Sequence, residues 1–317
     1  MAINRIQFQP GLSLTTFLEQ YGTEASCEAA LERWRWPDGF VCPRCAGRIA
    51  SRFQRGHLSL WQCRDCGHQT SLIAGTVFES THLPLTTWFQ AAFHLTQAKN
   101  GVSALELKRL VGVNDKAAWR LKHKLMQVMD ERESDRLLHG RVEVDDAYLG
   151  GVRAGKPGRG AEGKAPFVIA VETDPDAQRP RFVRLDPLPA FSKAALLEWA
   201  KQALAPSALL VSDGLACFVS AGEWAAGHER VVVGVRKRSE LESFHWVNTL
   251  LGNLKNAIRG TYHSFKVKKY AGRYLAEFQY RFNRRFDLPA MLPRLLRVCT
   301  QTGPRPEHWL RSAEEWG

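Results

Sequence analysis

Two pairs of cysteines constrain the fold of this chain more than any other feature of its sequence. The pairs are Cys42-Pro-Arg-Cys45 and Cys63-Arg-Asp-Cys66, and the 17 residues from 46 to 62 separate them. Each pair can form a tight turn that presents two thiolates, and two such turns close a tetrahedral shell of four sulfurs around Zn²⁺. A redox-active CxxC is the alternative, but a redox motif needs no second pair at this spacing. The sequence therefore predicts a structural zinc site, since four protein ligands leave no position open for catalysis.

Arginines are frequent around the predicted zinc site, and Arg44 and Arg64 lie inside the two CxxC turns. Such a surface suits contact with DNA phosphates, and a protein-contact surface is the alternative. The total of seven cysteines is odd, which argues against a disulfide framework. The three cysteines outside the pairs are predicted to be packing thiols: Cys27, Cys217 and Cys299.

The charge balance points to a polyanionic partner. The chain has 317 residues, enough for about two domains, and its 44 Lys and Arg against 32 Asp and Glu give a formal charge of +12. Nucleic acid is the first candidate, and a basic surface that is merely solvated is the alternative. No segment approaches the roughly 18 apolar residues of a membrane span, and the N-terminus lacks the apolar run of a signal peptide. We therefore expect a soluble, cytoplasmic protein without a membrane partner.

A helical pattern occupies residues 12–36 and returns in residues 86–100 and 103–131. The last stretch divides at residues 111–114, where a glycine-centred turn outlines a helix-turn-helix. Its second helix would carry Arg120, Lys122 and Lys124 where they could meet phosphates. A plain helical hairpin whose charges are solvated fits the same pattern.

After Gly140 the sequence changes to short runs of β-branched residues. Five strands are predicted, with a helix over residues 192–204 between the third and the fourth. Their residues are 141–149, 167–173, 181–188, 208–213 and 229–235. This order suggests an α/β domain with a mixed sheet and helices packed on it. Helices are predicted again from 242 to 296, and an irregular tail follows.

Two aspartates lie at or near the ends of predicted strands, Asp145 in VEVDDAYLGG and Asp213 in LLVSDGLACF. Carboxylates at the ends of neighbouring strands can converge on Mg²⁺, which prefers oxygen ligands. Two such ions, roughly 4 Å apart, can serve a phosphodiester substitution. The alternative for each aspartate is a turn former, and Asp213-Gly214 fits that alternative well.

At this point the sequence resembles a known family. VEVDDAYLGG, SDGLACF, HWVNTLLGNLKNAIRGTYH and YLAEFQYRFNRR, together with the CxxC pairs and TSLIAGTVF, resemble bacterial insertion-sequence transposases. Those proteins carry an N-terminal zinc ribbon and a DDE-type domain of the ribonuclease-H-like fold. The resemblance runs from about residue 15 to residue 290, and the order and spacing of its motifs are specific.

The resemblance implies a metal site in which asparagine replaces the usual third acid. The matching positions are Asp145, Asp213, Asn248 and Lys255. Seven residues at about 100° each return almost to the starting direction, so Asn248 and Lys255 share a helix face. Asn248 would offer its amide oxygen to Mg²⁺ or Mn²⁺, two ions in all, and Lys255 its ammonium to a phosphate. The family further implies DNA transposition, double-stranded DNA partners and a homodimer or higher multimer.

Nearby carboxylates leave the third ligand open. Glu240 and Glu242 precede the helix of Asn248 and could supply the missing acid. Asp146 adjoins Asp145, and because adjacent side chains of a strand face opposite sides, we expect at most one of them in the site. Glu277 is expected to pair with Arg281 at i,i+4.

Basic residues cluster where a DNA channel would need them, and contacts of this kind give affinity without reading sequence. The predicted channel residues are Arg153, Lys156, Arg159, Lys164, Arg236, Lys237, Arg238, Lys266, Lys268 and Lys269.

The predicted organisation is as follows. Residues 1–80 form the N-terminal helices and zinc ribbon, 81–135 a helical DNA-binding region, 136–300 the ribonuclease-H-like catalytic domain and 301–317 a tail. Two other functions remain open: a zinc-ribbon DNA-binding regulator with an inactive second domain, and a nuclease that cuts but never joins.

Overall fold

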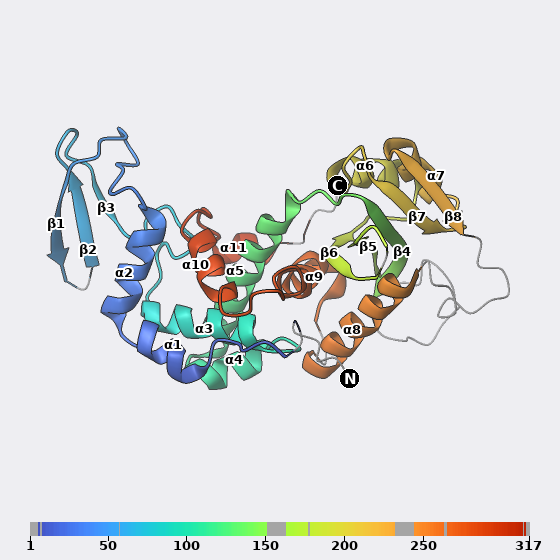
Figure 1. Ribbon diagram of the computed structural model, residues 1–317. Coiled ribbons are helices and arrows are strands. Elements are labelled where there is room, and N and C mark those ends of the chain that lie inside the picture. Colours follow the sequence, from blue (N-terminus) through green and yellow to red (C-terminus); the bar gives the residue numbers. More distant parts are fainter. Residues whose placement is uncertain are drawn as a thin grey trace. The chain divides into compact units, whose positions relative to one another are not determined.

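The computed structural model describes residues 6, 8–56, 58–150, 163–176, 178–231, 244–262, 265–312 and 314. The chain divides into two compact units (Figure 1). Unit 1 comprises Met1–Val128 and Asp287–Leu310, and unit 2 comprises Met129–Phe286 and Arg311–Gly317.

This division differs from the predicted boundaries at its C-terminal side. Helix α10 (Met291–Cys299) belongs to unit 1, whereas the sequence placed these residues in the catalytic domain. The cause is the apolar face of α10, on which Met291, Leu292 and Leu295 are buried. That face packs against α2 (Glu24–Arg35) and α3 (Leu85–Gln97). The short helix α11 (Glu307–Leu310) lies in the predicted tail.

The N-terminal part of unit 1 consists of α1 (Leu14–Tyr21), α2 and a small antiparallel sheet of β1 (Ala50–Arg55), β2 (Leu58–Cys63) and β3 (Gln69–Ser71). Thr23 begins α2 with a capping box, because its side chain and that of Ser26 each accept from the other residue's backbone N–H. Arg35, at the end of α2, donates to the carbonyl oxygens of Ser71 and Ala74 at 3.2 and 2.6 Å. The segment after β3 is thereby fastened to α2.

The predicted helix-turn-helix is formed by α4 (Ala104–Val111) and α5 (Asp115–Ser134). Gly112 ends α4 with a φ of 68°, in the left-handed region that glycine adopts without strain. Asn114 then begins α5 by accepting the N–H of Ala117 at 2.8 Å. The turn therefore uses the residue types that its backbone requires.

Unit 2 is built on a five-stranded mixed sheet with the order β6-β5-β4-β7-β8. The strands are β4 (Arg141–Leu149), β5 (Ala165–Thr173), β6 (Pro180–Pro187), β7 (Leu209–Asp213) and β8 (Gly227–Val231). The β4–β5 and β5–β6 pairs are antiparallel, and the β4–β7 and β7–β8 pairs are parallel. The mixed sheet and its strand positions agree with the prediction from sequence.

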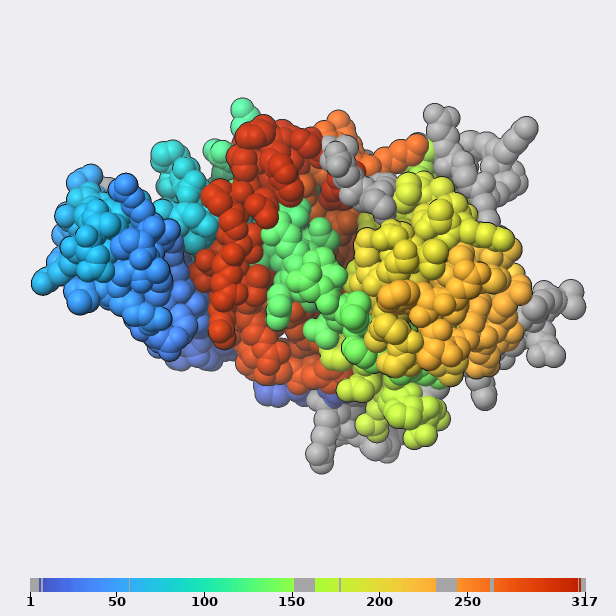
Figure 2. Space-filling model, turned by 90° about the horizontal axis from the view of Figure 1, so that it is seen from above, coloured from blue at the N-terminus to red at the C-terminus, as the bar shows by residue number. Residues whose placement is uncertain are grey.

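Helices cover both faces of this sheet (Figure 1). Val142 and Val144 of β4 face the core beneath α6 (Lys193–Ala203) and α7 (Phe218–Trp224). These two helices form an outer surface of unit 2, yellow to orange in Figure 2. Ala147 and Leu149 face the core beneath α8 (His245–Thr261) and α9 (Val267–Asn283). The strand order with helices on both faces is the ribonuclease-H-like arrangement, so the predicted fold class is confirmed.

Candidate functional site

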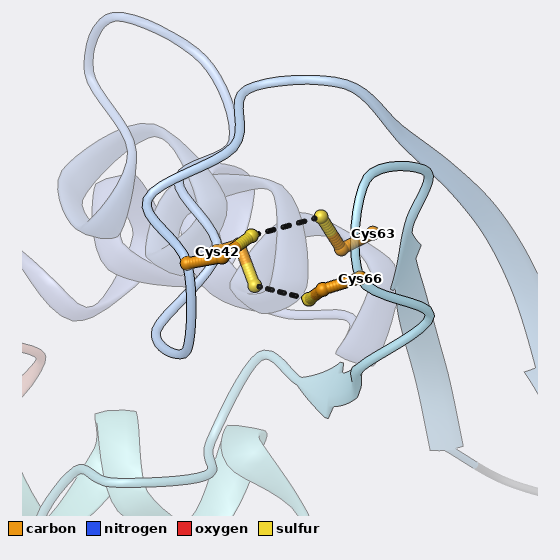
Figure 3. Close-up of side chains that lie close together, drawn as sticks. Cys42, Cys63 and Cys66 are labelled. Atoms are coloured by element: carbon orange, nitrogen blue, oxygen red, sulfur yellow. Dashed lines mark hydrogen bonds between the residues drawn. The ribbon is translucent and has the colours of Figure 1, made fainter.

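The four paired cysteines come together in unit 1 (Figure 3). The sulfurs of Cys42 and Cys66 are 3.7 Å apart, and those of Cys45 and Cys63 are 3.6 Å apart. All four sulfurs lie within 4.8 Å of one another. Zinc–sulfur bonds of about 2.3 Å in a tetrahedron require sulfurs roughly 3.8 Å apart. The four thiols therefore fit a structural Zn²⁺.

The two cysteine turns have the same backbone construction. The N–H of Ala46 bonds to the carbonyl of Cys42 at 2.9 Å, and the N–H of Gly67 bonds to the carbonyl of Cys63 at 3.0 Å. Burial acts to raise the pKa of Cys42, but hydrogen bonds from backbone groups of Cys45 and Arg44 outweigh it and lower that pKa to about 7. This shift favours the thiolate at Cys42, which is the form that binds a metal. In the same turn a backbone hydrogen bond from Gly47 acts to lower the pKa of Cys45, but hydrogen bonds with the side chains of Cys66 and Cys63 outweigh it and raise that pKa to about 12.

The two arginines inside these turns are exposed. Arg64 Nε also donates to Ser51 Oγ at 3.4 Å. Both guanidinium groups are therefore accessible to a phosphate.

The helix-turn-helix corrects one predicted contact. Lys122 is 0% exposed, so its side chain lies in the core of the helical region and is not available to a phosphate. The reason is its position on α5, because the flanking Leu121 and Leu125 are also buried. The sequence pattern did not show this, since a lysine on an amphipathic helix usually faces water.

The other two predicted basic residues of α5 already have partners. Arg120 is half-exposed and pairs with Glu307 at 3.5 Å. Lys124 donates to the carbonyl of Val77 at 2.8 Å, and burial together with the charge of Arg120 lowers its pKa. Lys124 thus holds the segment after β3 to α5.

Three carboxylates meet in unit 2 where the middle of β4 lies beside the end of β7. The parallel register pairs Val144 with Ser212, so the next residue of each strand is an aspartate on the same edge. One oxygen each from Asp145, Asp146 and Asp213 lies within 4.8 Å of the others. Asp145 and Asp213 are only 4% and 7% exposed.

The presence of Asp146 corrects the expectation that at most one of the two adjacent aspartates would enter the site. Asp146 pairs with Val168 of β5, and the paired register with β7 ends two residues before it, at Val144. The Oδ1 atom of Asp145 accepts the N–H of Asp146 at 2.9 Å, which turns that carboxylate along the strand. Strand alternation therefore does not separate these side chains here.

Asp213 combines the two roles that the sequence left open. Its Oδ1 accepts the N–H of Leu215 at 3.0 Å, as a turn-forming aspartate does. It also contributes an oxygen to the carboxylate cluster. A set of carboxylate oxygens is the donor chemistry that Mg²⁺ and Mn²⁺ prefer, so the residues present fit such an ion.

Helix α8 carries the other two predicted site residues. Asn248 is half-buried in its first turns, and Lys255 is exposed two turns later. The first turn is bonded to β4, because Glu143 Oε2 accepts the N–H groups of Trp246 and Val247 at 3.1 Å each. Nothing local in the sequence links Glu143 to a helix about a hundred residues away.

Several predicted residues lie outside the part of the chain that the structure describes: Arg153, Lys156, Arg159, Arg236, Lys237, Arg238, Glu240 and Glu242. Of the remaining basic residues, Lys268 is exposed and Lys269 lies 5.5 Å from the ring of Tyr270. The expected pair of Glu277 with Arg281 is present at 3.3 Å.

The geometry defines a class: a ribonuclease-H-like domain with a cluster of carboxylates on two neighbouring parallel strands, in one chain with a four-cysteine ribbon. Residues 22–69 match a family model described as a transposase zinc-ribbon domain. Residues 137–283 match one described as an ISXO2-like transposase domain. The chain belongs to the insertion-sequence transposases with an N-terminal zinc ribbon.

The individual proteins that match this chain share only a small part of its sequence. A protein of Halobacterium salinarum described as an uncharacterized protein in transposable element ISH50 is 28% identical over 145 residues, 45% of this chain and 46% of that protein. The chain thus spans about half the length of this curated relative.

Two solved structures are also similar. A pre-cleavage Mos1 transpososome aligns with 66% of this chain and 76% of its own chain, at 12% identity and a TM-score of 0.24. For the Mos1 mariner paired end complex with Mn the shares are 64% and 74%, the identity 13% and the TM-score 0.24. Because both TM-scores are low, the ribonuclease-H-like fold of unit 2 is assigned from its strand order alone. Among the described residues, no helix is both long and apolar enough to cross a membrane.

Proposed function

We propose that this chain catalyses the cleavage of DNA at the ends of its insertion element and the transfer of the freed 3′-hydroxyls into target DNA. The observation that carries this proposal is the convergence of Asp145 and Asp146, in the middle of β4, with Asp213 at the end of the parallel strand β7. Family membership supplies the reaction class, and the cluster supplies the oxygen ligands that a metal-dependent phosphoryl transfer requires.

Asp145 and Asp213 would bind the catalytic Mg²⁺ or Mn²⁺ through their carboxylate oxygens, and Asn248 would add an amide oxygen. Two ions bound there would stabilise the charge on the attacking and leaving oxygens of the phosphodiester. Asn248 brings no charge, so the three family ligands carry two negative charges. Asp146, which the carboxylate cluster includes, offers a third.

The remaining residues would hold the nucleic acid. Lys255 is exposed and would contact a phosphate of the bound strand. Arg44 and Arg64 on the zinc ribbon, with Lys268 on α9, would add contacts that position double-stranded DNA without reading its sequence. The chain would act as a homodimer or a higher multimer, as transposases must hold two element ends together.

The test is a cleavage and strand-transfer assay on labelled element ends. The ends are found as short inverted repeats around the coding sequence, bracketed by a duplicated target. Asp213→Ala should abolish both steps in Mg²⁺, and Asp176→Ala, an exposed carboxylate in the turn after β5, should leave both unchanged. Cutting without joining would show the nuclease, and binding without cutting would show the regulator.

The role of Asn248 has its own test in the same assay. Asn248→Ala should reduce cleavage and joining, because the metal site would lose one of its oxygen ligands. If this variant cuts and joins as well as the parent while Asp213→Ala is inactive, then the amide is not a ligand.

A further inference from the structure

Glu143 is a buried carboxylate next to the metal site. It lies on β4 two residues before Asp145, and because side chains alternate along a strand, the two share one face of the sheet. Glu143 is 0% exposed. Its Oε1 bonds to Arg141 Nη1 at 2.9 Å, and its Oε2 accepts the N–H groups of Trp246 and Val247. Every one of these contacts lies within unit 2.

Helix α8 depends on this carboxylate for its N-terminal cap. The helix begins after Phe244, whose side chain cannot accept a hydrogen bond and makes no cap. The first N–H groups of a helix have no partner within it, and a negative charge near them is favourable because of the helix dipole. Glu143 accepts hydrogen bonds from these N–H groups and supplies the negative charge, although it precedes Trp246 by 103 residues in the chain.

The cap connects the two parts of the metal site. Val247, whose N–H is bonded to Glu143, immediately precedes Asn248. On the other side, the strand of Glu143 continues directly to Asp145. The apolar contacts of Val247, Leu250 and Leu254 hold α8 on the sheet but allow sliding along it, whereas two directional hydrogen bonds define one position.

We propose that Glu143 is a positioning residue of the metal site: its carboxylate holds the first turn of α8 against β4 and thereby sets where Asn248 lies relative to Asp145. This inference rests on the proposed function, in which Asn248 is a ligand. Glu143 itself does not contact the metal, because both of its oxygens are bonded to protein groups. The negative charge of Glu143 also offsets the positive end of the α8 helix dipole, which would otherwise disfavour a cation nearby.

The test measures Mn²⁺ binding to the full-length protein by calorimetry, without DNA, in a double-mutant cycle. Glu143→Ala should weaken Mn²⁺ binding by about tenfold or more, as loss of a group that orients a ligand does. The same change in an Asn248→Ala background should have little further effect, because the ligand that Glu143 positions is then gone. Glu143→Gln, whose amide oxygen can accept one of the N–H groups, should restore part of the affinity.

Glu172→Ala is the matched control. Glu172 is also a buried carboxylate of this sheet and accepts a backbone N–H, that of His139 at 2.9 Å, but it does not cap α8. The Glu172→Ala change should have a small effect on Mn²⁺ binding, equal in the parent and in the Asn248→Ala variant. Hydrogen exchange at the amides of Trp246 and Val247 should accelerate in Glu143→Ala and not in Glu172→Ala.

Three results would overturn the inference: unchanged Mn²⁺ binding in Glu143→Ala, an equal loss with and without Asn248, or an Asn248→Ala variant that binds Mn²⁺ like the parent. If Glu143→Ala does not fold, Glu143→Gln takes its place in the cycle with a smaller expected loss, since its amide oxygen keeps part of the cap; no loss at all, or a loss that is equal with and without Asn248, then overturns the inference. Failure of the proposed function looks different, because Asp213→Ala would then also leave Mn²⁺ binding unchanged.

Discussion

At the scale of single residues, the acidic cluster shows how one neighbouring side chain changes the charge of a site. Asp145, Asp146 and Asp213 place three carboxylates together, while the ligand proposed on α8, Asn248, is a neutral amide. An amide oxygen can bind a hard cation, but it attracts the cation less strongly than a carboxylate does. Asp146 is therefore the residue that would compensate for Asn248.

Asp146→Asn is expected to weaken Mn²⁺ binding by about tenfold, since it keeps the shape of the side chain and removes its charge. Calorimetry on the DNA-free protein measures this. Asp145→Asn should cause a larger loss. If Asp146→Asn binds Mn²⁺ as tightly as the parent, the carboxylate of Asp146 makes no contribution to the site.

A second residue-scale effect concerns Asp130 on α5. Burial and the nearby carboxylates of Glu314 and Asp186 raise the pKa of Asp130 to about 7, although Arg273 opposes the shift. The folded state therefore holds a proton that the unfolded chain has lost between about pH 4 and pH 7, so this group makes stability fall as pH rises through that range. Asp130→Asn should remove that fall.

Urea unfolding at pH 5 and pH 8 measures this prediction. The variant should gain stability relative to the parent at pH 8 and gain less at pH 5. Asp176→Asn, which is exposed, serves as the control and should shift neither value. A gain that is equal at both pH values would contradict a raised pKa for Asp130.

At the scale of elements, the zinc ribbon is held by its metal ligands more than by its own core. The strand β1 is largely exposed, and Trp61 and Cys63 are among the few buried residues of β2. A sheet of this size does not fold stably without a metal or a disulfide.

Removal of zinc, by a chelator or by Cys63→Ser, should therefore unfold residues 40–71 and leave the sheet of unit 2 protected. Hydrogen exchange followed by mass spectrometry can compare peptides from β2 and from β5 in one experiment. The replacement Cys217→Ser, at a buried cysteine outside the pairs, should not reproduce the effect on β2. Continued protection of β2 without zinc would show that the ribbon has a sufficient core.

Helix α5 forms where the sequence predicts it, but Lys122 on this helix is buried and not exposed as predicted. Salt-dependent DNA binding can compare this lysine with Arg64, an exposed residue of the zinc ribbon. Arg64→Ala should reduce the slope of log affinity against log salt by about one unit, because one phosphate contact is lost. Lys122→Met should leave that slope unchanged, since Lys122 is buried. Fluorescence titration of a DNA duplex at several salt concentrations distinguishes them. A reduced slope for Lys122→Met would mean that the lysine reaches DNA after all.

At the scale of the whole molecule, the division between the two units falls within α5, and the last turns of this helix belong to unit 2. Glu133, at the end of α5, is buried and pairs with Arg284 at 2.5 Å, and it accepts the side-chain amide of Asn283 at 2.6 Å. This network fastens the end of α5 to the end of α9 within unit 2. Glu133 and Asn283, which this network joins, lie 150 positions apart in the chain.

Glu133→Ala should lower the free energy of unfolding by about 3 to 5 kcal/mol, because it leaves Arg284 buried without its partner. Glu198→Ala removes an exposed pair with Lys201 and should cost less than about 1 kcal/mol. Urea denaturation of both variants provides the comparison. Equal losses would show that Arg284 finds another partner when Glu133 is absent.

The sequence by itself determined the features that depend on local spacing. The CxxC pairs predicted the four-sulfur site, the short runs of β-branched residues predicted the strands of unit 2, and Gly112 marked the turn of the helix-turn-helix. Each of these depends on residues that lie near one another in the chain. The pattern of motifs was also sufficient to recognise the family.

Only the tertiary structure decided which distant residues meet. The cap of α8 by Glu143, the packing of α10 in unit 1 and the burial of Lys122 join segments whose own patterns give no sign of one another. Asp146 belongs to the carboxylate cluster although its side chain alternates with that of Asp145 along β4, and no pattern within the strand indicates this. Pairing, burial and register arise from the whole packed chain, so no local pattern could reveal them.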